Sequence, residues 1–138
     1  MSPISPRAAG EVGRLLASAE MLINGISPSR PEDDHGYDVV SVFGSKVCRV
    51  QVKTVYLKKP NGTVFSEVFS VRRQKKSKRR HGDERRRTYM DGEIDAFVFV
   101  SLVTRSFWVV PSSAIDLSRH SMTVRPNSTW HNAWHVLK

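Results

Sequence analysis

The dipeptide Gly44-Ser45 constrains the fold more than any other feature of this sequence, because strand-like sequence flanks it on both sides. Residues 37–43 and 46–56 are rich in valine and contain no proline or internal glycine. A two-residue loop that begins with glycine favours a type II′ hairpin turn. Such a turn also sets the register, because Phe43 then faces Lys46 and each earlier residue faces the one equally far beyond the turn. Residues 37–56 are therefore predicted to form an antiparallel hairpin.

This register brings three polar side chains to one face of the hairpin. Asp38 lies directly opposite Gln51, and directly paired side chains share a face with Cβ atoms about 4.5–5.5 Å apart. Lys53 lies two residues beyond Gln51, so it points to the same face, one diagonal step away. Val50 and Val52 point to the opposite face.

The three side chains suit the hydrolysis of a phosphodiester. That reaction uses a divalent ion to neutralise phosphate oxygens and to activate a water. Mg²⁺, or Mn²⁺ in its place, would take oxygens from Asp38, from Gln51 and from the backbone carbonyl of Val52. Lys53 would stabilise developing negative charge or orient the attacking water. The alternative is that these are ordinary solvent-facing positions of a strand.

An amphipathic helix is predicted over residues 6–24. Ser5 is an N-cap with Pro6 at the first helical position, and Asn24-Gly25 is a C-cap. The apolar residues that follow at helical spacing are Val12, Leu15, Leu16, Ala19, Leu22 and Ile23.

Glu11 is a fourth candidate for the site and a further candidate ligand for the metal ion. On a helical wheel it lies within roughly 40° of Leu15 and Leu22, so we expect it on the packed side of the helix, with Gly10 and Gly13 allowing close backbone approach. The alternative is that Glu11 only favours the helix N-terminus through the macrodipole.

The remaining strands complete an α+β fold. Residues 63–71 are predicted as a third strand that continues the hairpin into a meander. Residues 96–102 are almost entirely apolar, which indicates a strand buried on both faces. Residues 106–110 form a further strand, and 112–115 a short helical turn. We expect one domain over residues 1–138, with the helix packed on a mixed sheet and a tail over 117–138.

Nearly all of the net charge of +9 lies in one segment. Residues 72–87 contain ten basic and two acidic side chains, so they account for eight of the nine net charges. We expect an extension over residues 72–90 that contacts DNA phosphates. The alternative is a solvated charge run. The candidate DNA-binding residues are Arg72, Arg73, Lys75, Lys76, Lys78, Arg79, Arg80, Arg85, Arg86 and Arg87.

The single cysteine, Cys48, rules out an internal disulfide and suits a reducing compartment. The N-terminus has no apolar core typical of a signal peptide, and no run of about 18 apolar residues is present. We therefore expect a cytoplasmic or intracellular protein with no membrane span.

Four motifs resemble the PD-(D/E)XK nucleases associated with group I introns, which are homing endonucleases of the restriction-enzyme-like fold. They are GEVG (10–13), YDVV (37–40), RVQVKT (49–54) and EIDAFVFV (93–100). The resemblance covers roughly residues 8–115, and RVQVKT carries a Q-x-K signature in which glutamine replaces the usual acid. It implies an active site of Glu11, Asp38, Gln51 and Lys53. The sequence departs from the family in lacking a Pro-Asp dipeptide, since Tyr37 precedes Asp38.

The resulting expectation is a site-specific, Mg²⁺-dependent endonuclease acting on double-stranded DNA. One alternative is a Holliday-junction resolvase or another structure-specific nuclease, which shares the fold. Another is a nucleic-acid-binding protein without catalysis. A break in both strands needs two sites, so we expect a homodimer or homotetramer. Trp108, Trp130 and Trp134 are either its subunit contact or part of the monomer's own core.

Overall fold

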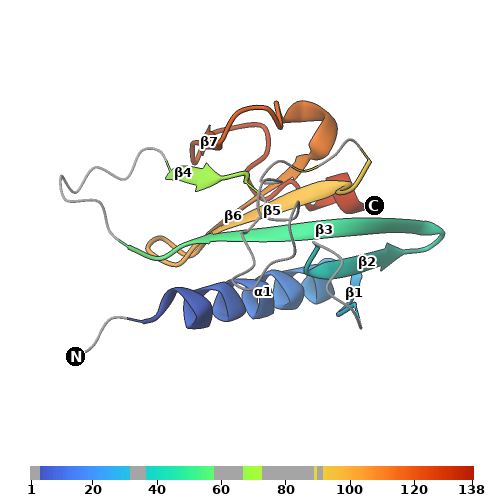
Figure 1. Cartoon of the computed structure of the whole chain (residues 1–138). Coiled ribbons are helices and arrows are strands. Elements are labelled where there is room, and N and C mark those ends of the chain that lie inside the picture. Colours follow the sequence, from blue (N-terminus) through green and yellow to red (C-terminus); the bar gives the residue numbers. More distant parts are fainter. Residues whose placement is uncertain (1–3, 32–36, 58–66, 73–88, 90–91) are drawn as a thin grey trace, which may run out of the picture.

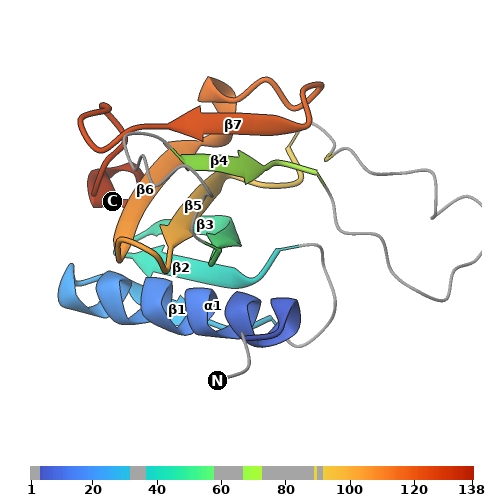
Figure 2. The same cartoon turned by 90° about the vertical axis from the view of Figure 1, so that its left-hand side faces the viewer.

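The protein has three layers in a computed structural model that describes residues 4–31, 37–57, 67–72, 89 and 92–138. Helix α1 covers one face of a five-stranded sheet, and a small two-stranded sheet covers the other (Figures 1 and 2). The elements are α1 (Pro6–Ile23), β1 (Ser27–Ser29), β2 (Val39–Phe43), β3 (Lys46–Val55), β4 (Glu67–Ser70), β5 (Ala96–Ser101), β6 (Ser106–Pro111) and β7 (Ser121–Val124), with 3-10 helices at Ser112–Ala114 and Trp134–Leu137.

The large sheet is mixed, as expected for the α+β class. Its strand order is β1-β2-β3-β5-β6, with β3 and β5 parallel and the other neighbours antiparallel. All six residues of β5 are buried, which confirms the prediction of a strand covered on both faces. Strand β5 lies between β3 and β6, and helix α1 and the small sheet pack on its two faces.

The β2–β3 hairpin has the predicted register. The pairs run from Phe43 opposite Lys46 to Val39 opposite Val50. Gly44 has a φ of 59°, in the region where a side chain is strained, while Ser45 has no positive φ. This combination is that of a type II′ turn, so the local loop chemistry decides how the two strands align.

The predicted three-strand meander is wrong. β4 does not extend the hairpin but pairs with β7 in a separate antiparallel sheet, with Glu67 opposite Val124. The edge of β3 away from β2 is occupied by β5, which pairs with it over six residues. Phe69 of β4 instead packs on Phe99, with ring centroids 4.8 Å apart, so β4 covers the sheet rather than widening it. Residues 63–66 of the predicted strand lie outside the described residues.

Helix α1 begins and ends as predicted, but it packs by a different face. The Ser5 hydroxyl accepts a hydrogen bond from the Ala8 amide at 3.1 Å, and Gly25 follows the helix with a φ of 77°. The buried residues are Ala9, Gly13, Ala17 and Met21. By contrast, Leu15, Leu22 and Ile23 are 53%, 63% and 76% exposed.

Close approach explains the choice of face. A Cβ on Gly13 would collide with the side chain of Thr54 on β3, so a residue without a side chain at this point lets the helix come this near to the sheet. The prediction that the leucine stripe faces the sheet is therefore wrong, and Gly13 is the glycine that makes the contact. Nothing lies within 4 Å of a Cβ built on Gly10.

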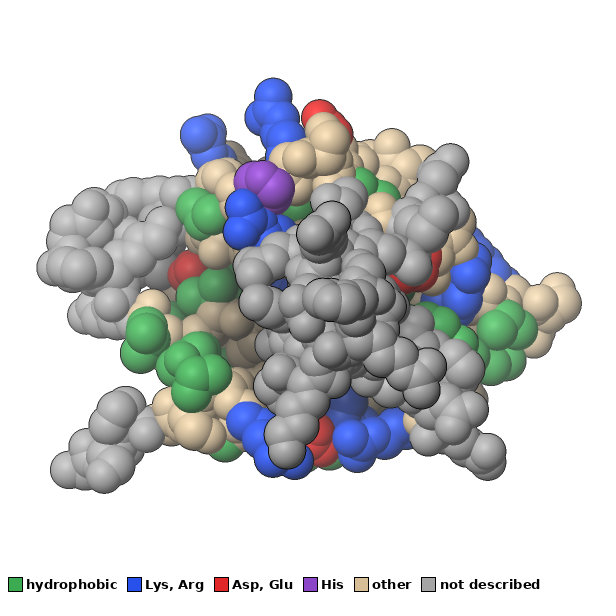
Figure 3. Space-filling view, viewed as in Figure 1, with side chains coloured by type: hydrophobic (Ala, Val, Ile, Leu, Met, Phe, Trp, Pro, Cys, Tyr) green, Lys and Arg blue, Asp and Glu red, His purple; other side chains and the backbone are tan. Residues whose placement is uncertain are grey.

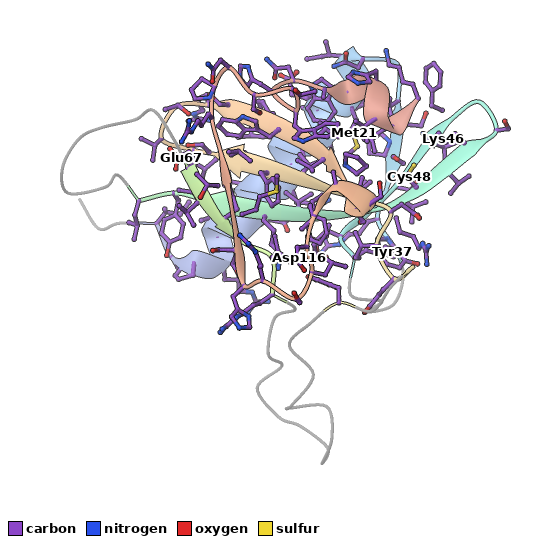
Figure 4. The ribbon with its side chains drawn as sticks, turned by 90° about the horizontal axis from the view of Figure 1, so that it is seen from above. Met21, Tyr37, Lys46, Cys48, Glu67 and Asp116 are labelled. Carbon is purple, nitrogen blue, oxygen red and sulfur yellow. The ribbon has the colours of Figure 1, made fainter. Side chains whose placement is uncertain are left out.

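The C-terminal tail completes the hydrophobic core on the face of the sheet that α1 covers. Trp134 and Leu137 are buried with the α1-facing residues, and Lys46 Nζ donates to the Val136 carbonyl at 3.0 Å. Figure 4 shows Lys46 on the long hairpin beside the C-terminal 3-10 helix. Trp108 is 1% exposed and Trp134 5%, so these two tryptophans belong to the monomer's own core. In the described part of the chain, no helix has the length and apolar character to cross a membrane.

Candidate active site

Asp38 and Gln51 meet as the register predicts. Asp38 precedes β2, and its amide donates at 2.9 Å to the carbonyl of Val50, the residue that pairs with Val39, so the regular pairing ends at Val39. Its carboxylate Oδ2 accepts hydrogen bonds from Gln51 Nε2 at 2.9 Å and from the Val52 amide at 3.1 Å. Both bonds go to the same oxygen.

Burial dominates the electrostatics of Asp38. It raises the pKa of this carboxyl above its ordinary value, and the Val52 hydrogen bond together with the charges of Lys53, Arg14 and Arg30 lowers it only in part. The carboxylate is thus less well stabilised by the protein alone than a carboxylate in water. A bound cation would supply the missing stabilisation.

Gln51 carries a second sign of an absent partner. Its Oε1 is buried and has no hydrogen-bond partner among the described residues, although Nε2 donates to Asp38 and, at 3.5 Å, to the Val52 carbonyl. Buried polar atoms without a partner are rare and costly, and an ion that is not part of the chain is one explanation for them. The donor set is one carboxylate, one amide oxygen and the Val52 carbonyl, all hard oxygens.

These donors fit a divalent ion of the Mg²⁺ type, which prefers oxygen and keeps several waters. Within the described ranges there is no group of three or more His, Cys, Asp and Glu side chains suited to a metal. The site therefore differs from a closed protein cage, and water or substrate oxygens would complete the coordination.

Lys53 lies on the same face, as predicted. Its side chain is largely buried, and burial lowers its pKa from 10.5 to about 8, with the charge of Asp38 acting in the opposite direction. The ammonium Nζ donates to the carbonyl of Arg72 at 2.6 Å and lies 5.3 Å from the centre of the Tyr89 ring. Neither contact could be read from the sequence, because 18 and 35 residues separate these partners from Lys53 in the chain and no local pattern links them.

Glu11 does not lie on the packed side of α1, contrary to the prediction. Its side chain is 45% exposed and forms an ion pair with Arg14, one turn along the helix, and a longer one with Arg30 at 3.9 Å. The Arg14 hydrogen bond holds the pKa of Glu11 below its ordinary value. The wheel argument correctly grouped Glu11 with Leu15 and Leu22, but that whole face is the outer one.

Arg14 and Arg30 connect Glu11 with the Asp38 site. Both guanidinium groups also act electrostatically on Asp38. In the view of Figure 3, basic and acidic side chains lie next to one another along the lower edge, over α1. The sequence analysis did not single out either arginine, and the spacing Glu11 to Arg14 at i,i+3 was the signal that would have suggested the first of them.

A second aspartate adjoins the site and is fully paired. Asp95 precedes β5 and accepts three hydrogen bonds from Arg49, one from the backbone at 2.7 Å and two from the guanidinium at 3.0 and 3.1 Å. Burial acts to raise the pKa of Asp95, but the hydrogen bonds and charge of Arg49 outweigh it, and the pKa is lowered. This pairing joins β3 to the start of β5 and makes Asp95 part of the scaffold.

The basic segment falls almost entirely outside the described residues. Of the candidate DNA-binding residues only Arg72 is described, and its carbonyl is the partner of Lys53. Arg73, Lys75, Lys76, Lys78, Arg79, Arg80, Arg85, Arg86 and Arg87 lie in the range that the structure does not describe.

Comparison with known proteins identifies the class. The sequence profile of the PD-(D/E)XK endonucleases matches residues 4–136, which is nearly the whole chain, so the chain belongs to this family and is a nuclease by class. Among solved structures, the chain is similar to a bacterial homing endonuclease, I-Ssp6803I, with a TM-score of 0.71 and 21% sequence identity over 96% of this chain and 93% of that one. At this identity the likeness establishes the restriction-endonuclease-like fold. A comparison with curated proteins returned no match.

Proposed function

We propose that this chain is a divalent-metal-dependent endonuclease that cuts double-stranded DNA at specific sites. The observation that carries the proposal is the buried Oε1 of Gln51, which has no partner among the described residues. Gln51 donates to the Asp38 carboxylate and shares its strand face with Lys53, in a chain of an endonuclease family. Similarity to a protein whose name describes a homing endonuclease supports the site-specific form of the proposal.

Each residue has a distinct part in this proposal. Asp38, Gln51 and the Val52 carbonyl would hold the Mg²⁺ or Mn²⁺ ion. Such an ion, when bound, neutralises phosphate oxygens and lowers the pKa of a water. Lys53 donates hydrogen bonds to the phosphate as negative charge develops there, and its partial burial strengthens that interaction. Glu11 adds negative charge near the site and keeps Arg14 in place.

The test is cleavage of a randomised plasmid library in Mg²⁺, comparing the wild type with Lys53→Ala. We expect discrete cleavage sites with the wild type and none with the variant. Cleavage confined to added four-way junctions would replace the proposal by a structure-specific nuclease. Binding without cleavage in Mg²⁺ and in Mn²⁺ would replace it by a non-catalytic nucleic-acid-binding protein.

We also propose that the basic segment supplies the DNA phosphate contacts. Its ten cations in sixteen residues are too many for a packed core. Neutralising Arg79, Arg80, Arg85, Arg86 and Arg87 together should weaken binding and reduce the salt slope of log K by about 4.5, since each lost phosphate contact removes about 0.9. An unchanged slope would contradict these contacts.

A homodimer or homotetramer completes the proposal, because one site cuts one strand. With Trp108 and Trp134 inside the monomer, the exposed stripe of Leu15, Leu22 and Ile23 is the surface to test. Light scattering should give a multiple of the chain mass, and Leu22→Lys should reduce it. A monomer that still breaks both strands at one site would contradict this assembly.

A further inference from the structure

We propose that Tyr89 is a positioning residue that, with the Arg72 carbonyl, holds the Lys53 ammonium away from Asp38, so that the aspartate stays open to a metal ion and the ammonium to a phosphate. The inference rests on the function proposed for the Asp38 site and adds to it a residue that does not itself touch the reacting atoms.

The Lys53 ammonium does not lie where attraction to Asp38 alone would place it. Lys53 and Asp38 attract each other electrostatically, yet the hydrogen-bond partner of Nζ is the Arg72 carbonyl, at 2.6 Å. The side chain has four flexible carbon–carbon bonds, and an unrestrained ammonium would move toward the nearest carboxylate. A direct Lys53–Asp38 pair would occupy the oxygen that a metal needs, because Asp38 is the carboxylate of the donor set.

The aromatic ring of Tyr89 holds the Lys53 ammonium in this position. The Tyr89 ring centre lies 5.3 Å from Nζ, within the range in which a cation is attracted to the negative face of an aromatic ring. Lys53 is largely buried, so little water competes, and such contacts are stronger when desolvated. A lysine ammonium has three donors, and the Arg72 carbonyl uses one of them.

The two residues that hold the ammonium, Tyr89 and Arg72, are themselves fixed by their packing and hydrogen bonds. Tyr89 is 4% exposed and packs edge-on against Phe97 at 5.5 Å, and Phe97 is the neighbour of Gln51 in the parallel β3–β5 pairing. Arg72 follows Val71, which is 1% exposed and whose amide donates to the His120 carbonyl at 3.1 Å. The holders are therefore fixed by the hydrophobic cluster over the sheet, independently of Lys53.

The position of the holders in the sequence is also informative. Arg72 and Tyr89 are the residues on either side of 73–88, the stretch that contains nearly all of the basic run. The two residues that place the reactive lysine are thus joined in the chain by the segment proposed to bind DNA. No other described residue of the site has this relation to it.

The test measures metal binding as well as cleavage in the full-length chain. Tyr89→Met fills the buried volume without an aromatic face, and Tyr89→Phe keeps the face but loses the hydroxyl. We expect Tyr89→Met to bind Mn²⁺, followed by electron paramagnetic resonance, about tenfold more weakly, as loss of a contact of about 1.4 kcal/mol would give. Its single-turnover cleavage at saturating DNA should fall by a similar factor with DNA affinity unchanged. Tyr89→Phe should bind Mn²⁺ and cleave DNA as the wild type does.

Two controls separate positioning from loss of fold. Val124→Ala removes volume from the same cluster, on β7, and should lower Tm without changing Mn²⁺ affinity. Tyr89→Phe with one, two or three ring fluorines keeps the shape while weakening the negative face, so Mn²⁺ affinity should fall stepwise with fluorine number. This series tests the role of the aromatic face even if Tyr89→Met does not fold.

Three results would overturn the inference. They are Mn²⁺ affinity independent of ring fluorination, an equal loss of affinity in Val124→Ala, or a Tyr89→Phe variant as impaired as Tyr89→Met. If the wild type binds Mn²⁺ but cleaves no DNA, the proposed function is wrong. The Mn²⁺ titrations of the variants still test the role of Tyr89 in that case.

Discussion

Two aspartates flank β3, and they differ in how completely the protein satisfies them. Asp38 precedes β2 on one side and Asp95 precedes β5 on the other, and each accepts a hydrogen bond from a β3 amide. Asp95 also receives the guanidinium of Arg49, whereas the side-chain partner of Asp38 is the neutral amide of Gln51. The pKa of Asp95 is lowered and that of Asp38 is raised.

The difference separates a structural carboxylate from the one that we propose to be reactive. Asp95 and Arg49 complete each other, so the pair joins β3 to β5 and needs nothing further. Asp38 has a raised pKa and Gln51 has a buried oxygen with no partner among the described residues, and a bound cation would relieve both. A site can therefore be found by what the fold leaves unsatisfied, even where a more complete ion pair adjoins it.

The largest expected effect tests this division directly. Asp38→Ala should lower the single-turnover rate of DNA cleavage in Mg²⁺ by about 10²–10³-fold or more, the scale seen when a group that stabilises transition-state charge is lost. DNA affinity measured in Ca²⁺ should change little. Asp95→Ala, checked for folding by circular dichroism, should still cleave. Equal loss of cleavage in two folded variants would break the comparison.

Lys53→Met should make the metal-free protein more stable at pH 7 while removing cleavage. Burial lowers the folded-state pKa of Lys53 to about 8, so the unfolded chain binds more protons between there and its ordinary pKa of 10.5. Wild-type stability therefore rises over that pH window. The variant should be more stable by about 1–3 kcal/mol at pH 7, and the gain should vanish above pH 10.5. Urea unfolding across pH 6–11 measures it, and a gain that does not depend on pH would contradict the burial of a charged lysine.

Gln51→Glu should turn the unsatisfied site into one that depends on metal. A second carboxylate beside Asp38 adds like charge, so in chelator we expect a loss of about 1 kcal/mol, or about 2–6 °C in Tm. Mg²⁺ should raise the Tm of this variant more than that of the wild type, and some cleavage should remain. Calorimetry with and without Mg²⁺ gives both values. The same Mg²⁺ response in both proteins would argue that Gln51 does not adjoin the ion.

Asp95→Asn should have the smallest effect, a loss of about 1 kcal/mol or less, because the Arg49 and Asp95 side chains are more than a third exposed. The pKa of Asp95 is lowered, so its contribution is present above the ordinary value of 3.8 and is lost as the pH falls through the lowered value. Asp38 has a raised pKa, so the stability difference for Asp38→Asn should have the opposite pH dependence. Thermal melts between pH 2 and pH 6 compare them, and parallel curves would remove the distinction.

The hairpin register could be predicted because it depends on neighbours in sequence. A two-residue loop with a leading glycine permits few alignments, so the meeting of Asp38 with Gln51 followed from the turn alone. The helix ends and the burial of β5 were likewise predictable, from capping residues and from an unbroken apolar run. These features draw on interactions within a few residues of the chain.

Tertiary structure decided what local pattern left open. The helix has an exposed leucine stripe and a second stripe that contains Gly13. The stripe with Gly13 packs on the sheet because a side chain at that position would collide with Thr54. β4 joined β7 across more than fifty residues because β5 already occupied the free edge of β3. The holders of Lys53 arose from that same packing. The sequence by itself determined that the candidate groups share one face, since pleat and turn geometry are local. Only the three-dimensional packing determined which of them stay unsatisfied, since burial and distant partners depend on the whole chain.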